Sequence, residues 1–176
     1  DLIVGARNAD PAGNSNAGES YVVFGKDTGA AVDLVDVASG TGGFIINGMD
    51  EDDISGFSVS GAGDVNGDNL ADLIVGAPFA DPVGNSNAGE SYVVFGRDTG
   101  TTVSLADVAS GTGGFIINGI DQGDLSGFTV SGAGDVNGDG LADLVVGAPY
   151  ADPAGTTSAG ESYVVFGRDA GTAVSL

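Results

Sequence analysis

The sequence contains no cysteine and no histidine. Their absence excludes disulfides, thiolate nucleophiles, imidazole general bases and metal sites of the zinc type. Basic residues are scarce as well, with four Lys and Arg against 25 Asp and Glu, so that the formal net charge is −21. A protein of this sign repels nucleic acids and anionic membrane surfaces, and we expect neither as a partner.

Long apolar runs are also missing, and none approaches the roughly 20 residues that a membrane-spanning helix needs. The chain is nevertheless 41% hydrophobic, which is enough for its 176 residues to bury a core. The excess of negative charge needs a counterpart, and bound cations would supply one. The abrupt start at "DLIVGA", without a signal peptide, predicts a processed or fragmentary N-terminus.

What the sequence does contain is a repeat of 71 residues. "DLIVGA" begins at Asp1 and returns at Asp72 and, as "DLVVGAP", at Asp143. "GESYVVFG" occurs once in each of the three units, and "ASGTGGFIING" occurs in the first two. Self-similarity at a fixed spacing indicates that one structural unit is repeated along the chain.

Each complete unit contains four short strand-like runs bounded by Gly, Asn, Asp and Pro. In the second unit these runs are 56–62, 72–77, 90–96 and 113–119. Between the last two, "SLADVAS" (104–110) predicts either a single helical turn, with Ser104 as its N-cap, or a plain loop. Asp33, another good N-cap residue, holds the equivalent position in the first unit.

Repeated four-stranded units without long helices predict an all-β fold made of antiparallel β-propeller blades. A β-helix is less suitable, because its coils are much shorter than 71 residues. We assign 1–55 to a first blade without its opening strand, 56–126 to a complete blade and 127–176 to a third blade without its closing strand. Because propellers need about four to eight blades, these two and a half belong to a longer protein or to an assembly of chains.

Two copies of a carboxylate-rich loop precede the "DLIVGAP" and "DLVVGAP" strands. Oxygen ligands at loop positions 1, 3, 5, 7 (a backbone carbonyl) and 9 are typical of calcium sites. The predicted ligands are Asp64, Asn66, Asp68, Leu70 (carbonyl) and Asp72, and in the second copy Asp135, Asn137, Asp139, Leu141 (carbonyl) and Asp143. Asp1 would be the ninth position of a third loop.

The chemistry of these loops favours Ca²⁺, because the ligands are hard oxygens and Mg²⁺ prefers to keep several waters. Position 6 needs a residue that tolerates positive φ, and Asn69 and Gly140 satisfy that need. The loops differ from an EF-hand, because the Glu at position 12 and the flanking helices are missing. The alternative is an acidic turn held by Asx hydrogen bonds.

A second acidic segment recurs as "GMDEDDISG" (48–56) and "GIDQGDLSG" (119–127). It is interpreted either as a further cation site or, more commonly for such turns, as solvated Asp side chains that bond nearby backbone amides.

The chain resembles the FG-GAP repeats of integrin α-subunit propellers and their bacterial relatives. The resemblance covers essentially the whole chain and is carried by "GDVNGDNLADLIVGAP" (63–78), "GDVNGDGLADLVVGAP" (134–149) and the "YVVFG" strands. It implies a propeller of about seven blades, with calcium in the hairpin loop between the first two strands of a blade. Ser55-Gly56 and Ser126-Gly127 stand where the family has Phe-Gly, so Phe57 or Phe128 would fill that space.

The function that follows is an extracellular, calcium-stabilised propeller module for adhesion or protein–protein interaction, with an unidentified protein or glycan ligand and with further copies of the repeat as partners. Loops of extracellular modules bind calcium at about 10⁻⁴ to 10⁻³ M, which matches concentrations outside cells.

Two other functions are compatible with the repeats. A surface-layer, sheath or fibre protein could assemble end to end from such repeats. An enzyme with paired carboxylates is the third. We predict that the chain is not an enzyme, because the repeated carboxylates already have metal or turn roles and near-identical units leave no distinct active site.

Overall fold

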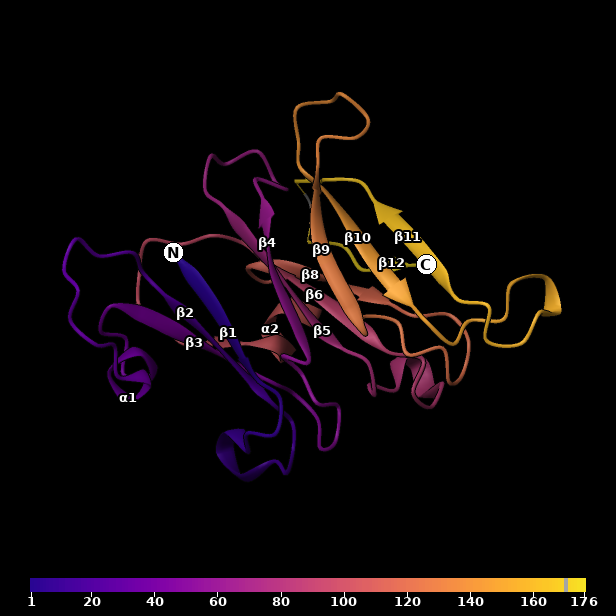
Figure 1. The fold of residues 1–176 in the computed structure, drawn as a ribbon, viewed down its shortest axis with the longest axis horizontal. Helices are drawn as coiled ribbons and strands as arrows, with labels where there is room; N and C mark the ends of the chain where they lie inside the picture. Colours follow the sequence, from indigo (N-terminus) through magenta and orange to yellow (C-terminus); the bar gives the residue numbers. More distant parts are fainter. Residues whose placement is uncertain (170) are drawn as a thin grey trace.

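The computed structural model describes residues 1–169 and 171–176. Its described residues form twelve β-strands and only short helical turns, so the predicted all-β class is confirmed. The strands build three sheets that stand side by side along the long axis of the molecule, from β1 near the N-terminus to β11 near the C-terminus (Figure 1).

The middle sheet is a complete antiparallel blade. Its strands are β4 (Ser58–Gly63), β5 (Asp72–Ala77), β6 (Glu90–Val94) and β8 (Gly114–Asn118). They lie in the order β8-β6-β5-β4, as expected for consecutive strands of one propeller blade. The four strand-like runs predicted from the second unit are therefore confirmed: β5 has the predicted bounds, β6 and β8 are shorter than predicted, and β4 begins and ends later than predicted.

The two outer sheets contain three antiparallel strands of the blade pattern each. The first has β1 (Leu2–Ala6), β2 (Glu19–Val23) and β3 (Gly43–Asn47). The other has β9 (Thr129–Gly134), β10 (Asp143–Ala148) and β11 (Glu161–Val165). By repeat position these are the second to fourth strands of one blade and the first to third of another, which confirms the fold class of partial propeller blades.

Two short strands link neighbouring blades in a way that the sequence did not predict. β7 (Val103–Ser104) pairs in parallel with β3, and β12 (Val174–Ser175) pairs in parallel with β8. Each therefore adds to the outer strand of the preceding blade and crosses the predicted blade boundaries. Those boundaries remain a prediction.

The helical turn predicted as one of two alternatives at 104–110 is present there and after Asp33, whereas three further short turns were not predicted. The turns are α1 (Leu34–Ala38), α2 (Leu105–Ala109) and three 3₁₀ turns, η1 (Pro11–Gly13), η2 (Pro82–Gly84) and η3 (Pro153–Gly155). Asp33 caps α1 by accepting a hydrogen bond from the Val35 amide at 3.0 Å. Ser104 occupies the N-cap of α2 but makes no side-chain cap bond, and it also belongs to β7.

The core lies between the blades rather than within any one of them. Ile74, Val93 and Phe115 of the middle blade pack against Leu144 and Val146 of the next blade. At the corresponding positions on the other side, Val22 and Phe44 of the first blade pack with Val75 and Val94. Both faces of the middle sheet are thus covered, which explains its continuously apolar strands.

Aromatic and cationic side chains reinforce the same contacts. The Arg97 guanidinium lies 5.5 Å from the ring centre of Phe44 in the preceding blade, and Arg168 repeats this contact with Phe115 at 5.4 Å. Phe57 and Phe128 meet across the blades with ring centres 4.6 Å apart. The two phenylalanines that follow Ser-Gly therefore pack against each other.

The glycine of the Gly-Ala-Pro motif is required by the close approach of two backbones. A Cβ on Gly76 would lie 2.1 Å from the carbonyl oxygen of Gly127, which belongs to the next blade. Gly5 faces the carbonyl of Gly56 in the same way, also at 2.1 Å. A Cβ on Gly147 instead meets the Thr129 hydroxyl of its own blade at 2.4 Å.

We therefore expect Gly76→Ala to destabilise the chain by about 1–3 kcal/mol, because a backbone carbonyl must move to admit the methyl group. This corresponds to a melting temperature lowered by roughly 2–4 °C per kcal/mol for a chain of this size. Gly147→Ala is the matched control, since the exposed Thr129 side chain can rotate away. Equal melting temperatures for the two variants would contradict this account of the blade contact.

Candidate metal centre

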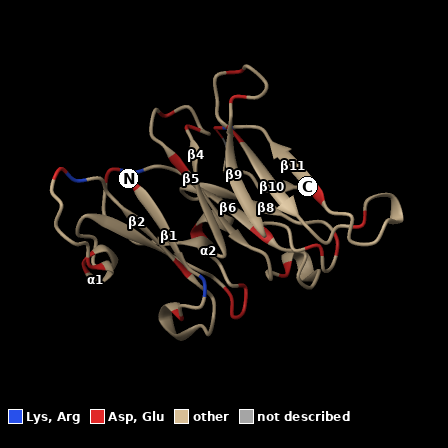
Figure 2. Cartoon of the chain, in the orientation of Figure 1, with Lys and Arg blue, Asp and Glu red and all other residues tan. Residues whose placement is uncertain are grey.

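The two predicted calcium loops project from the same edge of the molecule. One connects β4 to β5 and the other connects β9 to β10, and both carry acidic residues toward their tips (Figure 2). They lie near each other because β4 and β9 are adjacent in neighbouring blades (Figure 1).

The first loop is organised around the Asp64 carboxylate. Its Oδ1 accepts hydrogen bonds from the amides of Gly67 (2.7 Å) and Asp68 (3.1 Å), and its Oδ2 accepts one from Asn69 (2.9 Å). Gly67 and Asn69 reach these positions with φ of 81° and 69°. The positive φ predicted at loop position 6 is therefore present.

The remaining side chains of the loop bond to one another. Asn66 Oδ1 accepts from the Asp68 amide at 2.9 Å, and its Nδ2 donates to Asp68 Oδ2 at 2.9 Å. The other oxygen of Asp68 accepts from the Leu70 amide at 2.8 Å. Positions 1, 3 and 5 are thus gathered in one turn, with position 7 directly after them.

The second loop reproduces this geometry. Asp135 accepts from the amides of residues 138, 139 and 140 at 2.6, 3.1 and 2.9 Å. Asn137 Nδ2 donates to Asp139 at 2.9 Å, and Asp139 accepts from the Leu141 amide at 2.9 Å. Two copies with one pattern show that the loop conformation belongs to the repeat.

The predicted ninth ligand has a structural role that the sequence reasoning missed. Asp72 is fully buried and accepts from the amides of Val65 at 2.8 Å and Gly96 at 2.7 Å. It thereby ties the start of the loop and the end of β6 to the start of β5. Burial raises the pKa of this carboxyl, and the two amide bonds act in the opposite direction.

Asp143 and Asp1 occupy the same position in the other units. Asp143 accepts from the amides of Val136 and Gly167, each at 2.8 Å. Asp1 accepts from the Gly25 amide at 2.7 Å. The pattern of "Asp-Leu" at one strand start and "Phe-Gly" at the end of the next strand, repeated three times, was the signal that could have revealed this tie.

The oxygen donors of the two loops suit a hard cation, although their side chains accept hydrogen bonds from backbone amides in this structure. In the described residues, no three Asp, Glu, His or Cys side chains are arranged to hold a metal ion. In the first loop, Asp64 Oδ1 already accepts two hydrogen bonds, but Asp64 Oδ2 and both oxygens of Asp68 accept one each, so each of these three has a lone pair that a cation can share. The donor set consists of oxygens alone, which is the set that Ca²⁺ takes.

Neutralisation of these carboxylates does not come from the basic side chains. Arg7 stacks on Phe57 at 4.9 Å, and Arg97 and Arg168 stack on phenylalanines of the preceding blades. Lys26 donates to the backbone carbonyl of Ala31 at 3.2 Å. All four cations of the chain therefore have contacts outside the two loops.

The second acidic segment has a buried member. Asp53 is only 7% exposed and shares a pocket with Asp50, Asp81 and Glu90. Burial, followed by the nearby Glu90 charge, raises the pKa of Asp53 to about 7. Glu90 accepts a hydrogen bond from the hydroxyl of Tyr92, and burial raises its pKa as well. The segment is therefore more than a solvated turn at this position.

An all-β chain of four-stranded antiparallel blades with an oxygen-rich hairpin loop is a β-propeller repeat protein. The family model described as the FG-GAP repeat matches residues 55–94 and 126–165, and each match spans the first three strands of a blade with its candidate loop. The chain thus contains two FG-GAP repeats, and the predicted resemblance is confirmed.

Curated relatives agree with this assignment. Integrin alpha pat-2 of Caenorhabditis elegans is 32% identical over 126 residues, which are 69% of this chain and 10% of that protein. Integrin alpha-PS2 of Drosophila melanogaster is 34% identical over 73% of this chain and 9% of its own length. Phosphatidylinositol-glycan-specific phospholipase D of Mus musculus is 34% identical over 61% of this chain and 12% of that protein.

The chain therefore spans about a tenth of the length of the curated relatives it matches. Its relatives include integrin subunits as well as a phospholipase, so similarity alone does not decide between binding and catalysis. Across the residues that the structure describes, no helix has the length and apolar character to cross a membrane.

The buried Asp53 predicts a specific dependence of stability on pH. The pKa of Asp53 is about 7 in the folded chain, against 3.8 for an unperturbed aspartate, so the folded state holds an extra proton between these two pH values. The contribution of this carboxyl to the free energy of unfolding is therefore fully present below pH 3.8 and is lost as the pH rises through about 7. We expect Asp53→Asn to remove this loss.

The measurement is thermal unfolding between pH 5 and 8 in a chelating buffer. Because one pKa unit corresponds to about 1.4 kcal/mol, the variant should gain about 5 °C or more relative to the unmodified chain at the alkaline end. Glu51→Gln, an exposed neighbour, is the control and should keep the original pH dependence. A parallel pH dependence in Asp53→Asn would show that Asp53 ionises normally.

Proposed function

We propose that the chain is a calcium-stabilised, non-catalytic propeller module that acts outside the cell through contacts with other macromolecules. The observation that carries the proposal is the repeated loop, in which Asp, Asn and Asp side chains at positions 1, 3 and 5 are gathered with the same hydrogen bonds in both copies.

The proposed ligands in each loop are three side chains, one carbonyl and the aspartate at the start of the following strand. They are Asp64, Asn66, Asp68, Leu70 (carbonyl) and Asp72, with Asp135, Asn137, Asp139, Leu141 (carbonyl) and Asp143 in the second loop. Bound Ca²⁺ supplies charge neutralisation at these carboxylates. The aspartates at position 9 would then both bind the cation and hold neighbouring strands together through their backbone amides.

The first loop also contacts the neighbouring blade, so an ordered loop affects the packing of two blades. The Asp64 carbonyl accepts from the Ala142 amide and the Val65 carbonyl accepts from the Arg168 amide, both at 2.8 Å. Val65 itself is fully buried in the core between the blades. A cation that binds only the folded loop therefore stabilises the contact between two blades as well as one hairpin.

The extracellular assignment rests on the class of loop. Short oxygen-ligand loops of extracellular modules bind calcium at about 10⁻⁴ to 10⁻³ M, and such sites are filled outside cells. The integrin relatives support an interaction role, with a protein or glycan as the ligand class and adhesion as the process. The net charge of −21 disfavours nucleic acid as the partner.

A non-catalytic role is favoured over hydrolysis. The phospholipase D relative shares only 12% of its length with this chain, so its name does not bring an active site here. The repeated carboxylates of the chain are committed to the loops, the strand ties and the Glu–Tyr pairs.

Calcium should raise the melting temperature of the chain, whereas the same ionic strength of Mg²⁺ should not. At about 10 mM Ca²⁺ and the affinity range above, each filled loop contributes about 1.4–2.7 kcal/mol. This corresponds to an increase of roughly 3–10 °C per loop. Differential scanning calorimetry against a chelator measures the shift.

The two loops allow the contribution of each to be separated. Asp68→Ala and Asp139→Ala should each remove about half of the calcium-dependent increase, and the double variant should remove all of it. Asp98→Ala, which changes an exposed acid outside the loops, should retain the full increase. A calcium effect that persists in the double variant would overturn the assignment of these loops.

A further inference from the structure

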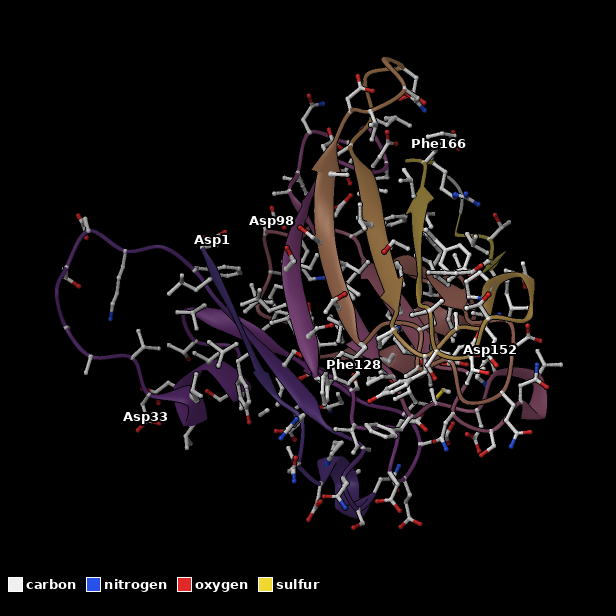
Figure 3. The ribbon with its side chains drawn as sticks, turned by 45° about the vertical axis from the view of Figure 1, so that its right-hand side comes forward. Asp1, Asp33, Asp98, Phe128, Asp152 and Phe166 are labelled. Atoms are coloured by element: carbon white, nitrogen blue, oxygen red, sulfur yellow. The ribbon has the colours of Figure 1, made fainter. Side chains whose placement is uncertain are left out.

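The two candidate calcium loops contact each other directly, through backbone groups and one side chain. The Ala142 amide of the second loop donates a hydrogen bond to the Asp64 carbonyl of the first loop at 2.8 Å. The Leu141 side chain lies so close to Gly67 of the first loop that a Cβ on this glycine would be 3.1 Å from the leucine Cδ2. Figure 3 shows the second loop (orange) beside the first (purple), at the end of the molecule where Phe166 lies.

The first link between the loops is a single peptide unit. Its carbonyl belongs to Leu141, the proposed backbone ligand at position 7 of the second loop, and its N–H belongs to Ala142. The acceptor of this N–H is Asp64, the residue at position 1 of the first loop. Because a peptide unit is planar and rigid, a carbonyl whose orientation is fixed also fixes the direction of its N–H. Hydrogen-bonded groups in a chain also polarise and strengthen one another.

The second link joins the aspartates at position 9 of the two loops. Asp143 accepts from the Gly167 amide at 2.8 Å, and the next amide, that of Arg168, donates to the Val65 carbonyl at 2.8 Å. The Val65 amide in turn donates to Asp72 at 2.8 Å. Asp72, Val65 and Asp143 are fully buried, so water does not compete for these bonds.

We infer that the two loops bind calcium cooperatively, because the groups that order one loop are hydrogen-bonded to the groups that order the other. A loop that is already ordered holds its half of both links in place, so the second binding event has fewer groups left to order. Thermodynamic linkage then requires that each loop strengthens calcium binding at the other by the same factor. This inference rests on the proposed calcium site and adds a coupling between its two copies.

Electrostatic repulsion between cations in neighbouring loops acts against this coupling. Salt screens such repulsion over about 8 Å at physiological ionic strength. The two links are direct hydrogen bonds and the second is buried, so salt weakens them much less. We therefore expect positive cooperativity at physiological ionic strength and a smaller effect in low salt.

The test is a calcium titration of the full 176-residue chain followed by nuclear magnetic resonance. The amide signals of Gly67 and Gly138 report the two loops separately, because each amide donates to the aspartate at position 1 of its own loop. Asp139→Ala disables the second loop and should weaken calcium binding reported by Gly67 at least about fivefold. Asp68→Ala should weaken the binding reported by Gly138 by the same factor.

Ala142→Pro tests the first link, because proline lacks the amide hydrogen that reaches Asp64. It should reduce the factor by which each loop strengthens the other to less than about half of its original value. Ala71→Pro is the matched control at the same position of the first loop. Within the part of the chain that the structure describes, the Ala71 amide donates no backbone hydrogen bond, so this variant should keep the coupling.

A second pair of variants leaves every backbone donor in place. Leu141→Ala removes the side chain beside Gly67 but keeps the carbonyl of position 7, and it should also lower the coupling factor. Leu70→Ala, at the equivalent and 43% exposed leucine of the first loop, should leave that factor unchanged. Circular dichroism checks that the four linker and control variants remain folded.

The outcomes separate this inference from the proposed function. If each loop binds calcium with the same affinity whether the other is intact or disabled, the inference fails and the calcium site stands. If neither Gly67 nor Gly138 responds to calcium, the proposed site and the inference fail together. An equal loss of coupling in Ala71→Pro and Ala142→Pro, with no difference between Leu70→Ala and Leu141→Ala, would also contradict the inference.

Discussion

The contact between neighbouring blades is the interaction on which the rest of this molecule depends. Each sheet is apolar on both faces, so one blade by itself cannot bury its strands. In the middle blade Val75 is covered from one side and Val93 from the other, and both are fully buried. The same requirement explains why Gly76 leaves room for the carbonyl of Gly127 and why arginines stack on phenylalanines of the preceding blade.

The candidate calcium loops are part of this contact rather than separate from it. Val65 lies within the first loop and inside the core between two blades, and the loop carbonyls accept amides of the next blade. The order of the loop and the packing of the blades are therefore coupled through the backbone. The third blade exposes the equivalent Val136, because no following blade covers it in this structure.

The acidic residues of the chain lie in two different environments. The loop carboxylates are near the surface and hold many hydrogen bonds from backbone amides, an arrangement that suits a shared cation. Asp53 and Glu90 are buried near each other, and there burial favours the protonated form. The basic residues do not neutralise the carboxylates in either environment, because their contacts are with aromatic rings and a backbone carbonyl.

The repeat, the strands and the loop were determined by the sequence, because each depends on residues that are close along the chain. Alternating and apolar runs define β4 and β5, and the spacing of Asp64, Asn66 and Asp68 defines the turn between them. Only the tertiary structure decided the rest. Asp72 reaches Gly96, β7 joins β3, and Asp53 is buried, because each of these depends on segments that the fold brings together from distant parts of the chain.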